Sequence, residues 1–265
     1  MPTPLPNFKS PPLIEVVCGV QFDGLPRFAT PHFGAFWERL RREYPQTEDR
    51  PPLAEILEPI GEVQQPPRVE LVDLPPLRRV FFVDRTTNYL VQVQPTRFLS
   101  NWRKVLPDDD YPRFTTAYER FVNTWLEFRQ FVDEMSLGAL RCNQYELSYI
   151  NHFPTSGSFP EEWTSFLRAA PWPEKREFLP HPLAATSQLT FRLPDNHGML
   201  RATITHGKRE ADGHAVMVVD FTARGPADGA ATNRDEWFSM AHEWIVRGFA
   251  DLTTAAAHDR WGRLE

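Results

Sequence analysis

Apolar and polar residues alternate along several short stretches of the chain. In Ile14–Phe22 every second residue is apolar, which gathers the apolar side chains on one face of an extended segment and predicts a β-strand. Strand-forming residues between turn-like sequences predict further strands over Arg68–Asp73, Arg79–Asp84, Asn88–Gln94, Gln144–Phe153, Ser187–Leu193, Met199–His206 and Ala215–Ala223.

Apolar residues three and four positions apart predict amphipathic helices around these strands. The first helix starts at Thr30-Pro31, with Thr as the N-cap and Pro at the first helical position, and stops at Tyr44-Pro45. A long helix is predicted from about Tyr111 to Met135. Two more are predicted from Ser158 to about Arg168 and from Asn233 to Leu252, each beginning with a capping box.

The elements follow the same order twice along the chain. We predict an α+β fold with two β-α-β-β-β-α pseudo-repeats, at about residues 11–138 and 142–256, within one compact domain of residues 1–265. Glu15–Phe22 aligns without a gap on Glu146–Phe153. Because one half has too few strands to cover its long helix, we expect one curved, largely antiparallel sheet with the long helices on one face. A single non-duplicated helix-grip-like fold with an internal pocket is the alternative.

Charge and cysteine content narrow the class of protein. The chain has 29 Lys and Arg against 35 Asp and Glu, with no long run of either sign, which disfavours binding to nucleic acid. Cys18 and Cys142 form no CxxC motif and indicate free thiols in a reducing compartment. No secretion signal and no apolar run of about 18 residues is present, so we expect a cytoplasmic protein without membrane contact.

Motifs of known enzyme classes are missing from the sequence. There is no glycine-rich phosphate loop, no GxSxG elbow and no HExxH motif. His206 and His214 are the closest histidine pair and lack an obvious third metal ligand. We therefore expect no cofactor and no metal, and an enzymatic function is uncertain and disfavoured.

Strand alternation singles out a polar set in the second half of the chain. If Leu147, Tyr149, Asn151 and Phe153 face the helices, polar residues on the same and neighbouring strands share the opposite face. The candidate ligand-binding residues are Glu146, Ser148, His152, Arg192, Arg201 and Thr203. Such a face could bind an anionic ligand or host acid–base chemistry. A solvated sheet face gives the same alternation and is the simpler interpretation.

Two aromatic and basic segments are candidates for a protein interface. Asn101-Trp102-Arg103 precedes the long helix, and a Trp beside an Arg is typical of interface hot spots. The same residues could instead cap a sheet edge. In the C-terminal tail, His258, Arg260, Trp261 and Arg263 either dock back onto the sheet, which we favour, or contact another subunit.

Several segments resemble a sporadically distributed bacterial protein family of uncharacterised function. They include Pro11–Val17, Tyr89–Gln94, Arg97–Arg103, Tyr111-Pro112, Glu146–His152 and Trp261–Arg263. The resemblance spans nearly the whole chain. It implies one full-length unit and assigns no catalytic residue, cofactor or substrate.

Three functions follow from these patterns. Our leading hypothesis is a non-enzymatic binding or assembly module that uses the curved sheet face or exposed aromatic residues to hold a protein partner or a second copy. The alternative is an enzyme or small-ligand binder with Glu146 and His152 as acid–base candidates beside Arg192 and Arg201. The third is single-stranded nucleic-acid binding on the sheet, which the acidic charge balance disfavours.

Overall fold

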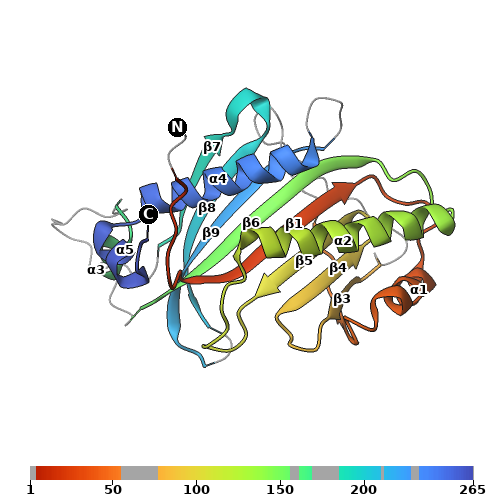
Figure 1. Ribbon diagram of the computed structural model, residues 1–265, viewed down its shortest axis with the longest axis horizontal. Coiled ribbons are helices and arrows are strands. Elements are labelled where there is room, and N and C mark those ends of the chain that lie inside the picture. The colour runs from red at the N-terminus through yellow and green to blue at the C-terminus, as the bar shows by residue number, and fades with distance from the viewer. Residues whose placement is uncertain are drawn as a thin grey trace.

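The computed structural model describes residues 4–54, 77–155, 161–168, 185–209, 212–227 and 233–264 (Figure 1). Within these ranges the strands are β1 (Leu13–Phe22), β2 (Gln46–Arg50), β3 (Arg79–Val83), β4 (Tyr89–Gln94), β5 (Arg97–Arg103), β6 (Cys142–Pro154), β7 (Ser187–Arg192), β8 (Met199–Lys208) and β9 (Ala215–Pro226). The helices are α1 (Thr30–Leu40), α2 (Arg113–Glu134), α3 (Glu161–Phe166), α4 (Arg234–Leu252) and α5 (Ala255–Trp261), with a short 3-10 turn at Pro194–Asn196.

All described strands belong to one antiparallel sheet, in the order β2-β3-β4-β5-β1-β6-β9-β8-β7. The fold is therefore α+β. At the centre β1 pairs with β6, which places Cys18 opposite Leu147 and Gly19 opposite Glu146. Strands that are distant in sequence thus lie side by side in the middle of the sheet.

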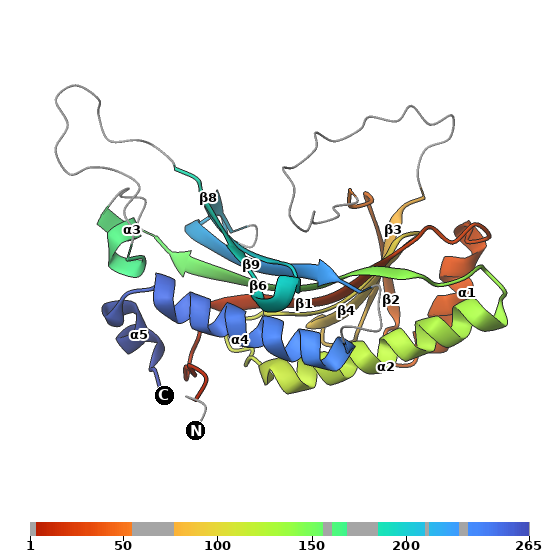
Figure 2. The ribbon, with the colours of Figure 1, turned by 90° about the horizontal axis from the view of Figure 1, so that it is seen from above.

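The helices cover one face of the sheet and leave the other face open. In Figure 2, α2 and α4 run along one side, while β3 and β8, toward the two ends of the sheet, extend to the other side. The open face is consequently concave. The apolar residues of β1, among them Val16, Cys18 and Val20, point toward the helices and are buried. Aromatic side chains of α2, including Phe121 and Phe128, complete the core from the helix side.

Two strands of the first half differ from the sequence prediction. Arg97–Arg103 forms the strand β5, which the pattern does not predict. This strand is hard to recognise because Leu99 interrupts the polar side of its alternation. β2 was also not expected, and the strand predicted over Arg68–Asp73 lies outside the described residues.

The starts of α1 and α4 agree with the sequence to within a residue, and α2 begins at Arg113, two residues after the expected Tyr111. Asn233 caps α4, because its side chain accepts a hydrogen bond from the Asp235 backbone N–H at 2.9 Å. In α1 the N-cap is Ala29 and Thr30 is already helical, since the His32 ring accepts a hydrogen bond from the Ala29 N–H at 2.8 Å. The Ser158 cap expected for α3 lies outside the described residues.

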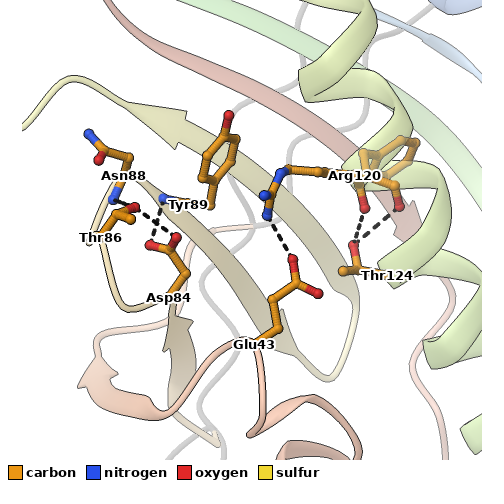
Figure 3. A network of polar contacts seen from close by, with 8 residues as sticks. Glu43, Asp84, Thr86, Asn88, Tyr89, Arg120 and Thr124 are labelled. Atoms are coloured by element: carbon orange, nitrogen blue, oxygen red, sulfur yellow. Dashed lines mark hydrogen bonds and ion pairs between the residues drawn. The ribbon is translucent and has the colours of Figure 1, made fainter. Parts of the chain in front are cut away.

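A polar cluster fixes α2 against the edge half of the sheet (Figure 3). Arg120 of α2 donates a hydrogen bond to Glu43 Oε1 at 2.7 Å, and its guanidinium lies 3.9 Å from the centre of the Tyr89 ring. Asp84 closes the turn before β4 by accepting hydrogen bonds from the Thr86 hydroxyl at 2.7 Å and the Tyr89 N–H at 3.1 Å. These contacts join α2, the turn after α1 and the β3–β4 hairpin, so the cluster has a structural role.

The C-terminal segment docks back onto the N-terminal residues and the core. The Leu264 N–H donates to the Asn7 carbonyl at 2.8 Å, and the Lys9 N–H donates to the Gly262 carbonyl at 3.0 Å. The Trp261 ring is buried and lies 5.0 Å from the Phe153 ring and 5.2 Å from the Phe249 ring. α5 is thereby part of the core, as the favoured interpretation of the tail expects.

Among the described residues, no helix is long and apolar enough to cross a membrane.

Candidate functional site

A hollow of about 490 Å³ lies on the open face of the sheet, over β3, β4, β5, β1, β6 and β9. The side chains that line it alternate with core residues along the same strands. For example, Glu15 lines the hollow while its neighbour Val16 belongs to the core, and Asn101 lines the hollow while Trp102 belongs to the core. Period-two alternation thus builds an apolar layer on one side of the sheet and this hollow on the other.

A continuous chain of hydrogen bonds crosses the floor of the hollow. Arg79 donates to Gln92 Oε1 at 2.8 Å, and Gln92 donates to Asn101 Oδ1 at 2.9 Å. Asn101 in turn donates to the Glu15 carboxylate at 2.7 Å. The chain runs from a cation through two amides to an anion across the four neighbouring strands β3, β4, β5 and β1. Each member therefore fixes the orientation of the next one.

The floor also binds a backbone segment of the protein itself. The side-chain amide of Gln94 accepts a hydrogen bond from the Leu53 N–H at 3.0 Å and donates to the Leu53 carbonyl at 3.2 Å. Arg97, which is only 4% exposed, donates to Gln21 Oε1 at 2.6 Å and to the Ala54 carbonyl at 3.4 Å. Residues Leu53 and Ala54 are thus held through their backbone groups.

The β6–β9 side of the hollow carries an ion pair and a hydroxyl relay. Arg224 Nε donates to the Glu146 carboxylate at 2.6 Å, and both side chains are largely buried. Ser148 and Thr222 share a hydrogen bond of 2.7 Å, and the Thr222 hydroxyl donates to Asp220 at 2.9 Å. Charged and neutral polar groups alternate here, as on the β5 side.

Two carboxyl groups in the hollow have raised pKa values. Burial raises the pKa of Glu15, against the lowering effects of the Asn101 hydrogen bond and of Arg103. Burial also raises the pKa of Asp220, against the effects of Thr222 and Arg224. The two residues flank Ile150 in one cross-strand row, about 10 Å apart at two strand spacings. At the β3 end of the hollow, burial and nearby Arg50 lower the pKa of Arg79.

The six residues expected to bind a ligand do not all meet at this place. Glu146 and Ser148 line the hollow. Arg201 and Thr203 lie one strand further out on the same face, opposite Thr222 and Asp220. Arg192 is exposed on β7, at the sheet edge.

His152 is separated from Glu146 by six residues of one strand, or roughly 20 Å. The two side chains share a face but not a site, because strand rise separates them. They therefore cannot act as an acid–base pair on one substrate atom. Burial and nearby Arg209 lower the pKa of His152.

The interpretation that the open face of the sheet is only a solvated surface is wrong at the centre of the sheet. Besides Glu146 and Ser148, the buried polar residues on this face are Gln21, Gln92, Gln94, Arg97, Asn101, Gln144 and Thr222. Sheet curvature and the segment at Leu53 place these side chains against one another. A face that only met water would leave them exposed, since burying polar groups costs free energy unless they are hydrogen-bonded.

The candidate interface segment Asn101-Trp102-Arg103 divides between the two faces. Trp102 is 2% exposed and packs on Tyr111 in the core, at 5.4 Å between ring centres. Asn101 belongs to the floor of the hollow, and Arg103 lines it while donating to the Thr87 carbonyl at 2.8 Å. Trp102 is thus not available to a partner, because neighbouring residues of a strand point to opposite sides.

The candidate residues of the tail divide in a similar way. His258 and Trp261 are buried, and His258 shares a hydrogen bond of 2.8 Å with the Thr253 hydroxyl. Arg263 contacts the His258 ring at 3.0 Å, and Arg260 is exposed over the Phe166 ring. The two aromatic residues are therefore structural, and the two arginines are accessible.

Sequence reasoning missed most of the charged residues of the hollow, namely Glu15, Arg79, Arg97, Asp220 and Arg224. The signal was present, because these residues alternate with core residues just as Glu146 alternates with Leu147. What the sequence does not contain is the pairing of β1 with β6, which unites the two groups.

Among the described residues, no group of three or more His, Cys, Asp or Glu side chains could hold a metal ion. No protein-family model matches the chain, and neither a curated protein nor a solved structure matches it.

Proposed function

We propose that this protein is a non-enzymatic binding module whose concave sheet face holds an extended segment of a partner protein. The observation that carries the proposal is the pair of hydrogen bonds between the Gln94 amide and the backbone of Leu53. Through them the open face already binds the backbone N–H and carbonyl groups of one residue. The neighbouring part of the hollow offers the same kinds of groups.

The charged floor supports a polypeptide as the occupant. An extended peptide presents backbone donors and acceptors along its whole length, and amide side chains can bond to both. Gln92 and Asn101 supply such groups, while Arg103 and Glu146 can pair with charged side chains. A concave, polar, preorganised floor suits such a ligand because little conformational entropy is lost in the protein.

Peptide binding with a blocked hollow tests the proposal. Short peptides are selected from a random-sequence display library against the wild-type protein, and their Kd is measured by fluorescence anisotropy. Ile150 is half-buried in the middle of the hollow, so Ile150→Trp fills the site without changing its charge. We expect this substitution to weaken binding by about tenfold or more.

Glu127→Trp is the matched control, because Glu127 is exposed on α2 in the helix layer. We expect it to leave the Kd unchanged, with thermal unfolding confirming that both variants fold. Equal peptide binding by the two Trp variants, or a failure to select any peptide, would contradict the proposal.

A small polar molecule is a second candidate occupant. The raised pKa values of Glu15 and Asp220 favour it, since perturbed carboxyl groups in a hollow are typical of ligand and acid–base sites. For this candidate function, Glu15 and Asp220 are the acid–base candidates in place of Glu146 and His152. Zwitterionic amino acids are the probe: a thermal shift in the wild-type protein that Ile150→Trp abolishes would support this candidate, and no shift would remove it.

Single-stranded nucleic acid is less well supported. Phe81 is the single aromatic residue in the described lining of the hollow, and the Arg79 guanidinium already covers it at 4.9 Å from the ring centre. Binding to unpaired bases relies on several stacking platforms. Retention on an oligonucleotide column at low salt would argue against this conclusion.

We also propose that the two halves of the sheet are pseudo-repeats within one domain. The antiparallel pairing of β1 with β6 and the hairpins β4–β5 and β8–β9 on either side support this idea. β2 and α5 are additions outside the shared order. Superposition of β1, β3–β5 and α2 on β6, β7–β9 and α4 in an experimental structure tests it, and a failure to superpose would refute it.

A cytoplasmic location is proposed for this module. The two cysteines are free and lie on the neighbouring strands β1 and β6, but Cys142 is opposite Phe22 and Cys18 is opposite Leu147, and free thiols suit a reducing compartment. Cell fractionation of the tagged protein tests this, and recovery outside the cytoplasm would contradict it.

A further inference from the structure

A second cavity, of about 470 Å³, lies on the helix side of the sheet. α2 begins at Arg113, near the middle of α4, where the Phe114 and His242 rings stack at 4.1 Å. Beyond this point α4 has no α2 neighbour, and the N-terminal segment around Phe8 fills the gap only in part. The cavity is the space that remains. Its volume is in the range typical of small-molecule sites.

Three polar groups converge on the wall of this cavity. The Tyr149 hydroxyl lies 2.9 Å from the Tyr111 hydroxyl and 3.0 Å from His242 Nδ1. If His242 Nδ1 carries the proton, it donates to Tyr149, Tyr149 donates to Tyr111, and the Tyr111 O–H is free to donate to a ligand. Burial lowers the pKa of His242 to about 4, so the ring is neutral at physiological pH.

The remaining described lining is mostly apolar, with three neutral polar residues, Asn7, Thr115 and Asn151, and one charged residue. Phe114, Phe221, Ile245 and Phe249 contribute apolar surface, and there is no Asp, Glu or Lys in the described lining. Arg113 provides the one charged group of that lining. It is exposed and donates to two neutral acceptors, Asn7 Oδ1 at 2.9 Å and the Phe8 carbonyl at 3.2 Å.

We propose that this cavity binds an amphipathic carboxylate, with the apolar body among Phe114, Ile245 and Phe249 and the carboxylate at Arg113 and the Tyr111 hydroxyl. An apolar cavity selects the body of the ligand by excluding water from it. Arg113 has no carboxylate partner within the described part of the chain, so its guanidinium selects a negative charge at the end of the ligand. The site lies on the opposite face from the hollow and does not depend on the proposed peptide binding.

Titration calorimetry with decanoate and decanol separates the two parts of this proposal. Wild-type protein is expected to bind both, and decanoate more tightly. Arg113→Gln is expected to weaken decanoate by about tenfold or more, because a charged hydrogen bond is lost, while the Kd for decanol stays unchanged. Arg129→Gln removes the same charge from an exposed position of α2 outside the cavity and should leave both affinities unchanged.

Filling the cavity provides the second test. Val246→Trp is expected to abolish binding of both probes. If this variant does not fold, Thr115→Trp replaces it, because Thr115 is an exposed residue in the lining. No saturable binding to the wild type, equal binding after filling, or equal losses in Arg113→Gln and Arg129→Gln would overturn the proposal.

Discussion

The Leu99 side chain lies directly over the backbone of Gly19, where any Cβ atom would overlap with its Cδ2 atom. The two residues are register partners on β5 and β1, and Leu99 is buried in the floor of the hollow. The missing side chain of one residue thus makes room for the other. Glycine at this position serves close packing and not an unusual backbone conformation.

Gly19→Ala should therefore destabilise the protein. We expect a loss of about 1–3 kcal/mol in the free energy of unfolding, because Leu99 must leave its position in a packed environment. Gly34→Ala is the control, since Gly34 is exposed on α1 and nothing lies near its missing Cβ. It should stabilise the protein by about 0.5–1 kcal/mol, the cost of Gly in a helix. Urea unfolding measures both, and equal effects would contradict this packing.

The raised pKa of Glu15 makes stability depend on pH in a definite direction. A carboxyl whose pKa is raised by folding contributes stability below its ordinary pKa near 4.5, and this contribution is lost as the pH rises through the folded value. Glu15→Gln keeps the acceptor for Asn101 but cannot ionise. Relative to wild type, we expect the variant to gain stability progressively above pH 4.5. A difference that does not change with pH would refute this.

The lowered pKa of His242 has the opposite consequence. The unfolded histidine takes up a proton below pH 6.5, whereas the folded one does so only near pH 4. Stability should fall between these values by up to roughly 3 kcal/mol, at about 1.4 kcal/mol per pKa unit. His242→Phe keeps the stacking on Phe114 and removes the titration. Its unfolding free energy should decline less in this window, and an identical decline would show that other groups dominate.

Docking of the tail can be tested with two neighbouring residues. Trp261→Ala should cost about 3–5 kcal/mol, because the ring is buried against Phe153 and Phe249. Arg260 is exposed and touches only the Phe166 ring among the contacts described, so Arg260→Ala should cost less than about 1 kcal/mol. Thermal unfolding compares them, and a small effect of Trp261→Ala would mean that α5 is not docked in solution.

Periodicity predicted the parts of the fold in which one face of an element is buried. The alternation of Leu147, Tyr149 and Phe153 with Glu146 and Ser148 assigns the two faces of β6 correctly. In Arg97–Arg103 the same pattern is obscured, because Leu99 lies on the polar side. The sequence therefore does not indicate a strand here, and Trp102, which was a candidate for an interface or a sheet-edge cap, belongs to the core.

The site required information that no local pattern contains. Glu15 and Asp220 are distant in sequence and come together because β6 lies between β1 and β9. Gln94 has its role through Leu53, a residue in a Pro-rich segment without periodicity. Likewise, the cavity at Tyr149 and His242 depends on where α2 begins relative to α4. Tertiary pairing decides these contacts.

Photo-crosslinking from the floor of the hollow tests the central claim most directly. Phe81 is a half-buried aromatic residue of the hollow and is replaced with benzoylphenylalanine, while Leu126, 49% exposed on α2, receives the same replacement as a control. We expect a peptide selected on the wild-type protein to crosslink at position 81 and not at position 126. Crosslinking at position 126 alone, or equally at both, would show that the concave face is not the binding site.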